Sequence, residues 1–327
     1  MEVQESNKTI EPSTFPFLST TRGLSAMSKM TVVTIALALC ACGKAPHQSA
    51  AASAAIETQG TGIIGGADAT GGEDFAKHIV GVYDATIGAI CTGTILSETI
   101  IITAAHCVES PASSLRVVFG TDFNSPQLAV RVVDAYKVSP LWAFRQGESL
   151  NTGDISVVKF SGGLPAGYKP MKFLTDATLL KDNASVMLAG FGASNVVQVR
   201  DPRTGRMVSD HQNAGKLRFV TTSIKKAVFS KSEVLVEQSK GKGACHGDSG
   251  GPAYTEVDGE MVVFGVTSRG VDDPNDTCGV SAAYTNVAYY ANWIVRTSRD
   301  LNQVNPTPAA VPTIANPANA PAEVASR

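Results

Sequence analysis

The chain has 327 residues and a formal net charge of −2 at neutral pH. This length suits one large domain or two modest ones, and 43 % hydrophobic with 17 % charged residues is an ordinary globular balance. The sequence has no basic stripe typical of nucleic-acid binding and no acidic tract typical of a chaperone. We therefore expect no nucleic-acid partner.

The N-terminal region carries an export signal. Lys29 precedes a short apolar run at 31–41. The run is shorter than the about 20 residues that a membrane-spanning helix needs, so it is typical of a signal peptide. The stretch LCACG at 39–43 resembles the bacterial lipobox. This resemblance implies acylation of Cys42 and a membrane-anchored lipoprotein at the periplasmic or cell surface; ordinary secretion is the alternative.

Residues 1–26 are polar and irregular, which indicates either a long n-region or an upstream start codon, with Met27 or Met30 as the true start. The small, polar stretch after the lipobox cannot bury a core and is typical of a tether or pro-segment. The Pro/Ala-rich C-terminal stretch is predicted to be disordered. The predicted divisions are a signal peptide (1–42), a tether or pro-segment (43–62), a folded domain (63–302) and a tail (303–327).

The folded part is predicted to be all-β. Short runs rich in Val, Ile, Thr, Phe and Tyr alternate with turn residues, a pattern of sandwiches and barrels. The clearest predicted helix is the last element, 288–301, with Trp293, Ile294 and Leu301 on one face. Helices of the length that a parallel sheet requires are absent between the runs. The expected strands fall within 78–85, 92–105, 115–120, 128–138, 155–160, 185–192, 216–224, 232–238, 261–268 and 282–287.

Three segments carry candidate chemistry. They are TAAHC, which holds His106; GDISVV, which holds Asp154; and GACHGDSGGP, which holds Ser249. Each alone has an ordinary explanation, because a lone histidine, an aspartate before a strand and a serine among glycines are usually structural. Together, within an all-β core, they indicate nucleophilic catalysis by a serine activated through a histidine.

These segments resemble the chymotrypsin-like (trypsin-fold) serine endopeptidases. TAAHC and GDSGGP match that family residue for residue, and GDISVVKF matches with conservative changes. IIGG at 63–66 resembles the mature N-terminus, and AGFG at 189–192 the start of a second barrel. The resemblance covers roughly 63–298. It implies two packed six-stranded antiparallel Greek-key β-barrels, about 63–172 and 173–285, followed by a C-terminal helix.

The resemblance also implies the roles of the site residues. His106 is expected to act as general base and acid, Asp154 to orient its ring, and Ser249 to attack the scissile carbonyl. The backbone N–H groups of Gly247 and Ser249 are expected to form the oxyanion hole. We expect a monomer that cleaves proteins or peptides without a cofactor.

Asp248 is expected to pair with the α-amino group of Ile63 after cleavage of the Gly62–Ile63 bond. Relatives carry a basic residue before this bond, whereas GTG precedes it here. A trypsin-like activator is therefore not expected; another protease, self-cleavage and an unprocessed form remain open.

The cysteines fit the same family. Cys91 with Cys107, and Cys245 with Cys278, match two family disulfides. Setting aside the two cysteines of the signal region leaves an even number, as a secreted disulfide protein should have. No CxxC or HxxxH spacing occurs, so we expect no metal site.

The expected substrate pocket is uncharged. Gly243 stands six residues before Ser249, where trypsin-like members carry an aspartate, so a cationic P1 side chain would find no counter-charge. Ser268, Gly270 and Ala282 are expected to line the pocket. Small walls favour an apolar or aromatic P1 residue, and a base narrowed by Ala282 would favour medium aliphatic ones.

Two further features are predicted away from P1. Arg269 stands where relatives carry tryptophan, which would favour acidic residues in the outer subsites. The insertion 200–213 is expected to be a solvated surface loop that includes His211, while His246 is expected on the pocket rim. Two other functions stay open, an inactive protease-like binding module and an esterase on the same fold.

Overall fold

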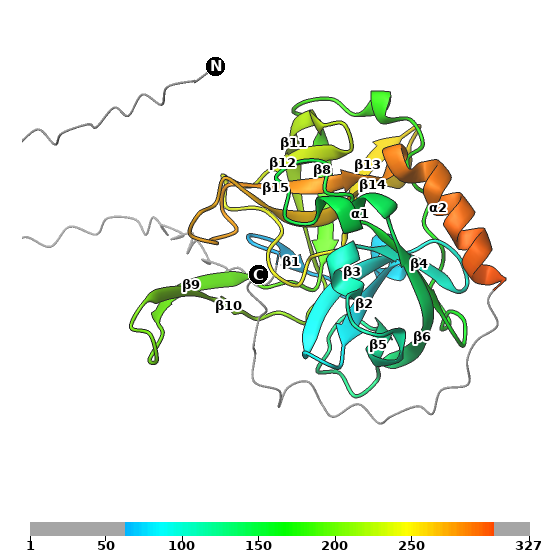
Figure 1. The fold of residues 1–327 in the computed structure, drawn as a ribbon, viewed down its shortest axis with the longest axis horizontal. Coiled ribbons are helices and arrows are strands. Elements are labelled where there is room, and N and C mark those ends of the chain that lie inside the picture. Colours follow the sequence, from blue (N-terminus) through cyan, green and yellow to red (C-terminus); the bar gives the residue numbers. More distant parts are fainter. Residues whose placement is uncertain (1–62, 304–327) are drawn as a thin grey trace, which may run out of the picture. The chain divides into compact units, whose positions relative to one another are not determined.

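The computed structural model describes residues 63–303, which form two closed antiparallel barrels (Figure 1). The first barrel has the strand order β2-β3-β4-β7-β6-β5. Its strands are β2 (Ile79–Asp84), β3 (Ala89–Ile95), β4 (Ile100–Thr103), β5 (Leu115–Phe119), β6 (Ala129–Val138) and β7 (Ser156–Phe160).

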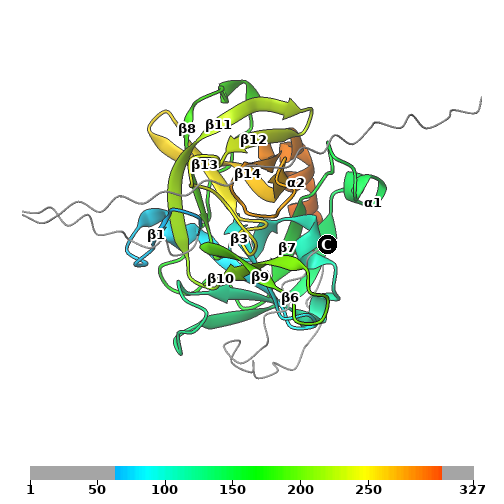
Figure 2. The ribbon, with the colours of Figure 1, turned by 90° about the vertical axis from the view of Figure 1, so that its left-hand side faces the viewer.

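The second barrel has the order β11-β12-β15-β14-β13-β8 and closes through pairing of β8 with β11. Figure 2 shows the curved strands of this barrel, with β11 and β8 next to each other. The expected pair of six-stranded barrels is thus confirmed. The strands are β8 (Ser185–Gly190), β11 (Arg218–Ser230), β12 (Glu233–Glu237), β13 (Pro252–Val257), β14 (Glu260–Val271) and β15 (Ser281–Asn286).

Further elements lie outside the two six-stranded barrels. They are β1 (Ala67–Asp68), the hairpin strands β9 (Asn195–Arg200) and β10 (Met207–Gln212), and the helices α1 (Pro140–Arg145) and α2 (Val287–Asn302). Four 3-10 turns lie at Asp74–His78, Ala105–Val108, Ala112–Ser114 and Ala177–Leu179.

The C-terminal helix joins the second barrel to the first. Asn286 ends β15 and caps α2, because its Oδ1 accepts hydrogen bonds from the backbone N–H groups of Ala288 and Tyr289. The buried face of α2 carries Ile294 and Leu301, which belong to the hydrophobic core of the first barrel. The predicted helix at 288–301 is therefore confirmed.

The N-terminal segment, which precedes the first barrel in the chain, packs on the second barrel. Ile63 is fully buried in the core of the second barrel. Ile64 pairs with Gly243, and β1 pairs with β11. The range predicted for the first barrel began at 63, but the structure places 63–68 on the second barrel. Burial of Ile63 there explains the difference, and each end of the domain ties one barrel to the other.

The insertion predicted as a loop is a β-hairpin. The strands β9 and β10 pair in register from Asn195 with Gln212 to Arg200 with Met207, and Figure 1 shows the hairpin projecting from the barrels. Asp201 Oδ1 accepts hydrogen bonds from Arg203 N and Thr204 N, which closes the turn.

Within residues 63–303, no helix combines the length and apolar character needed to cross a membrane. The predicted signal peptide with Cys42, the tether and the tail lie outside the described residues.

Candidate active site

A histidine and an aspartate from the first barrel form the centre of the site. His106 lies in the 3-10 turn after β4, and Asp154 lies just before β7. Because β4 and β7 are antiparallel neighbours, the end of one strand meets the start of the other. His106 Nδ1 is 2.8 Å from Asp154 Oδ2, so Nε2 remains available for a proton from another group.

Asp154 is buried and fully hydrogen-bonded. Its Oδ1 accepts from the backbone N–H groups of Ala105 and His106, at 2.7 and 3.1 Å. Its Oδ2 also accepts from Ser268 Oγ at 2.7 Å. These contacts hold the carboxylate in one orientation, with Ser268 contributed by β14 of the second barrel.

The electrostatics of the pair follow from its burial. Burial opposes ionisation of Asp154, but the charge and hydrogen bond of His106 and the Ser268 hydroxyl outweigh it and hold the pKa of Asp154 below its usual value. Burial also opposes protonation of His106, yet the Asp154 carboxylate outweighs it and raises the pKa of His106. The ring is thus made a stronger base.

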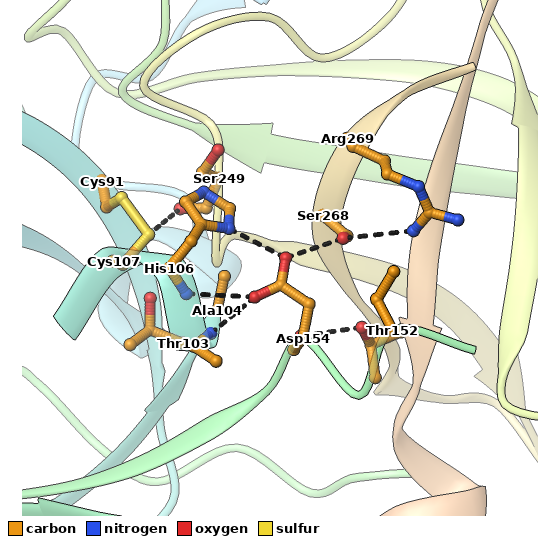
Figure 3. A network of polar contacts seen from close by, with 12 residues as sticks. Cys91, Thr103, Ala104, His106, Cys107, Thr152, Asp154, Ser249, Ser268 and Arg269 are labelled. Atoms are coloured by element: carbon orange, nitrogen blue, oxygen red, sulfur yellow. Dashed lines mark hydrogen bonds and ion pairs between the residues drawn. A yellow bond between two sulfur atoms is a disulfide. The ribbon is translucent and has the colours of Figure 1, made fainter. Parts of the chain in front are cut away.

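Ser249 is presented by a glycine-rich turn of the second barrel. Figure 3 shows it next to His106, and its carbonyl oxygen lies 3.6 Å from Sγ of Cys107. The same carbonyl accepts a hydrogen bond from Thr92 N at 2.8 Å. Gly247 and Gly250 flank it at φ 96° and 81°, in the left-handed region that favours glycine. The turn thus docks on β3 and on the 3-10 turn at Ala105–Val108 of the first barrel.

Asp248 forms hydrogen bonds within the second barrel. It is buried, and its two carboxylate oxygens accept hydrogen bonds from Gly192 N and Cys245 N, each at 2.8 Å. Burial raises the pKa of Asp248 to about 7, although these two bonds act in the opposite direction. A neighbouring cation would restore the ionised form.

Both expected disulfides are present. Cys91 is bonded to Cys107 beside His106, and Cys245 is bonded to Cys278 beside the serine turn. Cross-links in a domain of this kind indicate an oxidising, extracellular environment.

Gln238, which the sequence analysis does not single out, lies against Gly243, the residue expected at the pocket floor. A Cβ at Gly243 would collide with the side chain of Gln238. Gln238 is buried, and its Nε2 donates to the carbonyls of Ala244 (3.1 Å) and Cys278 (2.9 Å). Its Oε1 accepts from Ala244 N at 2.9 Å. The space left by the missing side chain of Gly243 is therefore filled by a neutral amide.

The other predicted pocket residues lie on two adjacent strands. Gly270 on β14 pairs with Ala282 on β15, and Ser268 precedes them on β14. Ala282 is buried. A side chain added at Gly270 would enter open space within the described part of the chain. The β14–β15 pair thus carries the small residues that the sequence predicts for the pocket walls.

Arg269 is not a free cation. Its Nη1 lies 2.8 Å from Oε1 of Glu233, whose side chain is fully buried, and its Nη2 donates to the carbonyl of Ser149. Glu233 also accepts hydrogen bonds from the backbone N–H groups of Asn151 and Thr152. Because the guanidinium is neutralised by its partner, the expected preference for acidic outer residues loses its basis.

An apolar surface near the histidine comes from α1. Trp142 lies with its ring centroid 6.3 Å from that of His106. Its helix begins with Pro140 after the N-cap Ser139, which accepts a hydrogen bond from Leu141 N. The sequence patterns do not predict a role for this tryptophan, although the Ser-Pro pair indicates a helix start.

Two closed antiparallel barrels, with a His–Asp pair whose aspartate is buried and a glycine-rich serine turn beside it, are the architecture of a double-barrel serine peptidase. The family model described as Trypsin matches residues 63–294. The chain therefore belongs to the trypsin family of serine peptidases, whose substrates are proteins.

Individual relatives agree with this assignment. Trypsin alpha of Drosophila melanogaster is 30 % identical over 223 residues, which cover 64 % of this chain and 78 % of that protein. Trypsin epsilon of Drosophila erecta is 28 % identical over 68 % of this chain and 89 % of that protein. Coagulation factor IX of Oryctolagus cuniculus is 24 % identical over 71 % of this chain and 83 % of that protein.

Proposed function

We propose that the chain is a serine endopeptidase in which Ser249 is the nucleophile, His106 the general base and acid, and Asp154 the residue that orients the imidazole. The observation that carries this proposal is the His106 Nδ1–Asp154 Oδ2 contact of 2.8 Å, because it leaves Nε2 as the proton acceptor. The serine turn docked beside Cys107 supports it.

The reaction proceeds in two displacements. Ser249 Oγ bonds to the scissile carbonyl carbon while its proton moves to His106 Nε2, and the backbone N–H groups of Gly247 and Ser249 stabilise the oxyanion. His106 then gives the proton to the leaving amine as the C–N bond breaks. Water, deprotonated by His106, hydrolyses the resulting acyl-enzyme.

The decisive test uses a fluorophosphonate probe on the matured protein, with Ser249→Ala as the matched control. We expect the wild type to be labelled and the variant not. Absence of labelling in a wild type that circular dichroism shows to be folded would instead favour an inactive binding module. Comparison of peptide and ester substrates separates an endopeptidase from an esterase.

Maturation is proposed to occur by cleavage between Gly62 and Ile63. Ile63 is buried in the second barrel, and a free α-amine there would supply the cation that buried Asp248 lacks in its pair of backbone contacts. N-terminal sequencing of active enzyme tests this step. Full activity with Gly62 still attached would contradict it.

The S1 pocket is proposed to take apolar P1 residues. Gly243 brings no charge, Gln238 fills the floor with a neutral amide, and Ala282 adds an apolar surface. A buried cation without a partner would be strongly disfavoured there. Digestion of a peptide library with varied P1 residues should show cleavage after apolar residues; dominant cleavage after Lys or Arg would refute the assignment.

We further propose export with acylation of Cys42, on the resemblance of LCACG to a lipobox. Intact mass of the protein from membranes of a bacterial host should show acyl chains, lost in Cys42→Ser. A wild type recovered without acyl chains in the soluble extracytoplasmic fraction would favour ordinary secretion.

A further inference from the structure

A cluster of two histidines and an aspartate lies beside the serine turn, and the proposed function does not use it. His211 is on β10, His246 immediately precedes Gly247, and Asp276 lies in the loop before β15. These residues are 30 or more positions apart in sequence, so no short motif announces them. The structure brings their possible ligand atoms within 4.8 Å of one another.

Both imidazole rings lie close to the carboxylate of Asp276. His246 Nε2 is 2.8 Å from Asp276 Oδ1 and 3.0 Å from Oδ2, and His211 Nε2 is 3.4 Å from Oδ2. The two rings lie with their centroids 4.0 Å apart. Two imidazole nitrogens therefore lie within 3.4 Å of one carboxylate, and His211 Nε2 is also 3.3 Å from the backbone carbonyl oxygen of Asp276.

The spacing suits a small tetrahedral ion. Bonds of about 2.0–2.1 Å at tetrahedral angles place neighbouring ligand atoms about 3.3 Å apart. The observed nitrogen–oxygen separations of 2.8 and 3.4 Å lie on either side of that value. Cys278 is close to the cluster, but its sulfur is bonded to Cys245 and is not a thiolate ligand.

The cluster is held in place by contacts that do not depend on an ion. The Cys245–Cys278 disulfide joins the segment of His246 to the segment of Asp276. On the hairpin, Ser209 Oγ donates to the Asn275 carbonyl at 2.8 Å. The His211 side chain is only 5 % exposed, so its ring has little freedom to turn away. A preorganised donor set lowers the entropic cost of binding.

We propose that His211, His246 and Asp276 form a binding site for a divalent transition-metal ion of the zinc type, with a fourth position open to water. The ion latches the β9–β10 hairpin and the Asp276 loop to the turn that carries Ser249. This site goes beyond the proposed peptidase function and does not depend on it, because binding can be measured without catalysis.

The test is a titration of metal-stripped full-length protein with Zn²⁺ by calorimetry, and with Co²⁺ by visible absorption. The background is Ser249→Ala, which prevents self-digestion, and free thiols are alkylated so that the N-terminal cysteines cannot contribute. We expect one equivalent of Zn²⁺ per chain and the intense visible bands of four-coordinate Co²⁺. Loss of groups that only orient a ligand costs 10–100-fold in affinity, so His211→Gln and Asp276→Asn should each weaken binding at least about 100-fold.

Matched controls separate this site from others. Asp272→Asn removes the same charge from the same loop, and His106→Ala removes the other histidine near Ser249; both should retain one equivalent of Zn²⁺. Hydrogen exchange should show protection of 195–212 when Zn²⁺ is added. Binding left unchanged in His211→Gln, or no saturable binding by folded protein, would overturn the proposal.

Discussion

The buried pair of Glu233 and Arg269 allows a quantitative test of how the second barrel supports the loop that leads to Asp154. Glu233 accepts hydrogen bonds from Asn151 N and Thr152 N, in addition to the Ser230 hydroxyl and Arg269. We consider Arg269→Met, which keeps most of the side-chain volume but removes the counter-charge from a carboxylate that is fully buried.

The magnitude follows from the burial of the two partners. Removing one member of a buried ion pair costs about 3–5 kcal/mol. The Arg269 side chain is 25 % exposed and Glu233 keeps its other donors, so we expect the lower end, about 3 kcal/mol of unfolding free energy. Glu233→Gln in the Arg269→Met background should recover at least about 1 kcal/mol, because the unpaired charge is gone.

Urea unfolding of the four members of this double-mutant cycle, all carrying Ser249→Ala, measures the coupling. The pKa of Glu233 is held below its usual value because Arg269 outweighs the effect of burial. The stabilisation is therefore present above the unfolded pKa of 4.5 and is lost as pH falls through the lower folded value. Single-variant effects that add within about 0.5 kcal/mol at pH 7 would refute the reasoning.

Three further predictions concern the site. Because the pKa of His106 is raised, kcat/KM for a neutral peptide should rise with pH through a midpoint above 6.5. A flat profile from pH 6 to 8 would contradict this expectation. In the same assay, Asp154→Asn should lower kcat about 10⁴-fold. Gly250→Ala should abolish labelling by the fluorophosphonate probe and destabilise the fold more than Gly241→Ala does. Both glycines have positive φ, but only a Cβ at residue 250 collides with residues of β3 and β4. Equal unfolding midpoints for the two variants would refute this explanation. Gln238→Ala should deepen the pocket and raise the preference for aromatic over small P1 residues about tenfold or more; an unchanged P1 profile would show that Gln238 does not form the floor.

Local sequence patterns predicted the short strands and the final helix because both depend on short-range periodicity. The arrangement of the strands as two six-stranded barrels was expected only from the family resemblance. The β2 segment around Val82 and the β7 segment around Val157 are runs of buried residues, and α2 begins at an asparagine cap. The His106, Asp154 and Ser249 segments were found because each has a local motif. Pairing of Cys91 with Cys107 was expected only from the family resemblance.

The sequence predicts a loop in place of this hairpin because the charged segment begins at Arg200. The predicted insertion therefore excludes the apolar positions Val196 and Val199 on β9. Seen as a whole, two extended runs flank the turn that Asp201 closes, which is the pattern of a hairpin. The polar character of β10 reflects solvent exposure of a two-stranded ribbon and not the absence of a strand.

Two buried polar contacts are not predicted, for a different reason. Gln238 lies against Gly243 through a local turn, in which Gly241 N donates to the Gln238 carbonyl, whereas Glu233 pairs with Arg269 on a strand 36 positions further along the chain. A buried glutamine and a buried glutamate have no pattern of their own in a strand. Their roles depend on which polar groups the fold leaves without solvent, and each must find a partner once buried.

The glycines of the two family stretches form one physical unit. A Cβ at Gly190 or Gly192, in the AGFG stretch, would collide with the carboxylate of Asp248, and Gly192 N donates to that carboxylate. A Cβ at Gly250 would in turn collide with Thr103, three residues before His106. Asp248 can be buried next to Ser249 because the AGFG stretch comes close enough for Gly192 N to donate a hydrogen bond to its carboxylate. Ser249 can approach His106 because Gly250 has no side chain that would collide with Thr103. Gly190 and Gly192 thus make room for Asp248 within the second barrel, and Gly250 allows the serine turn to contact the first barrel.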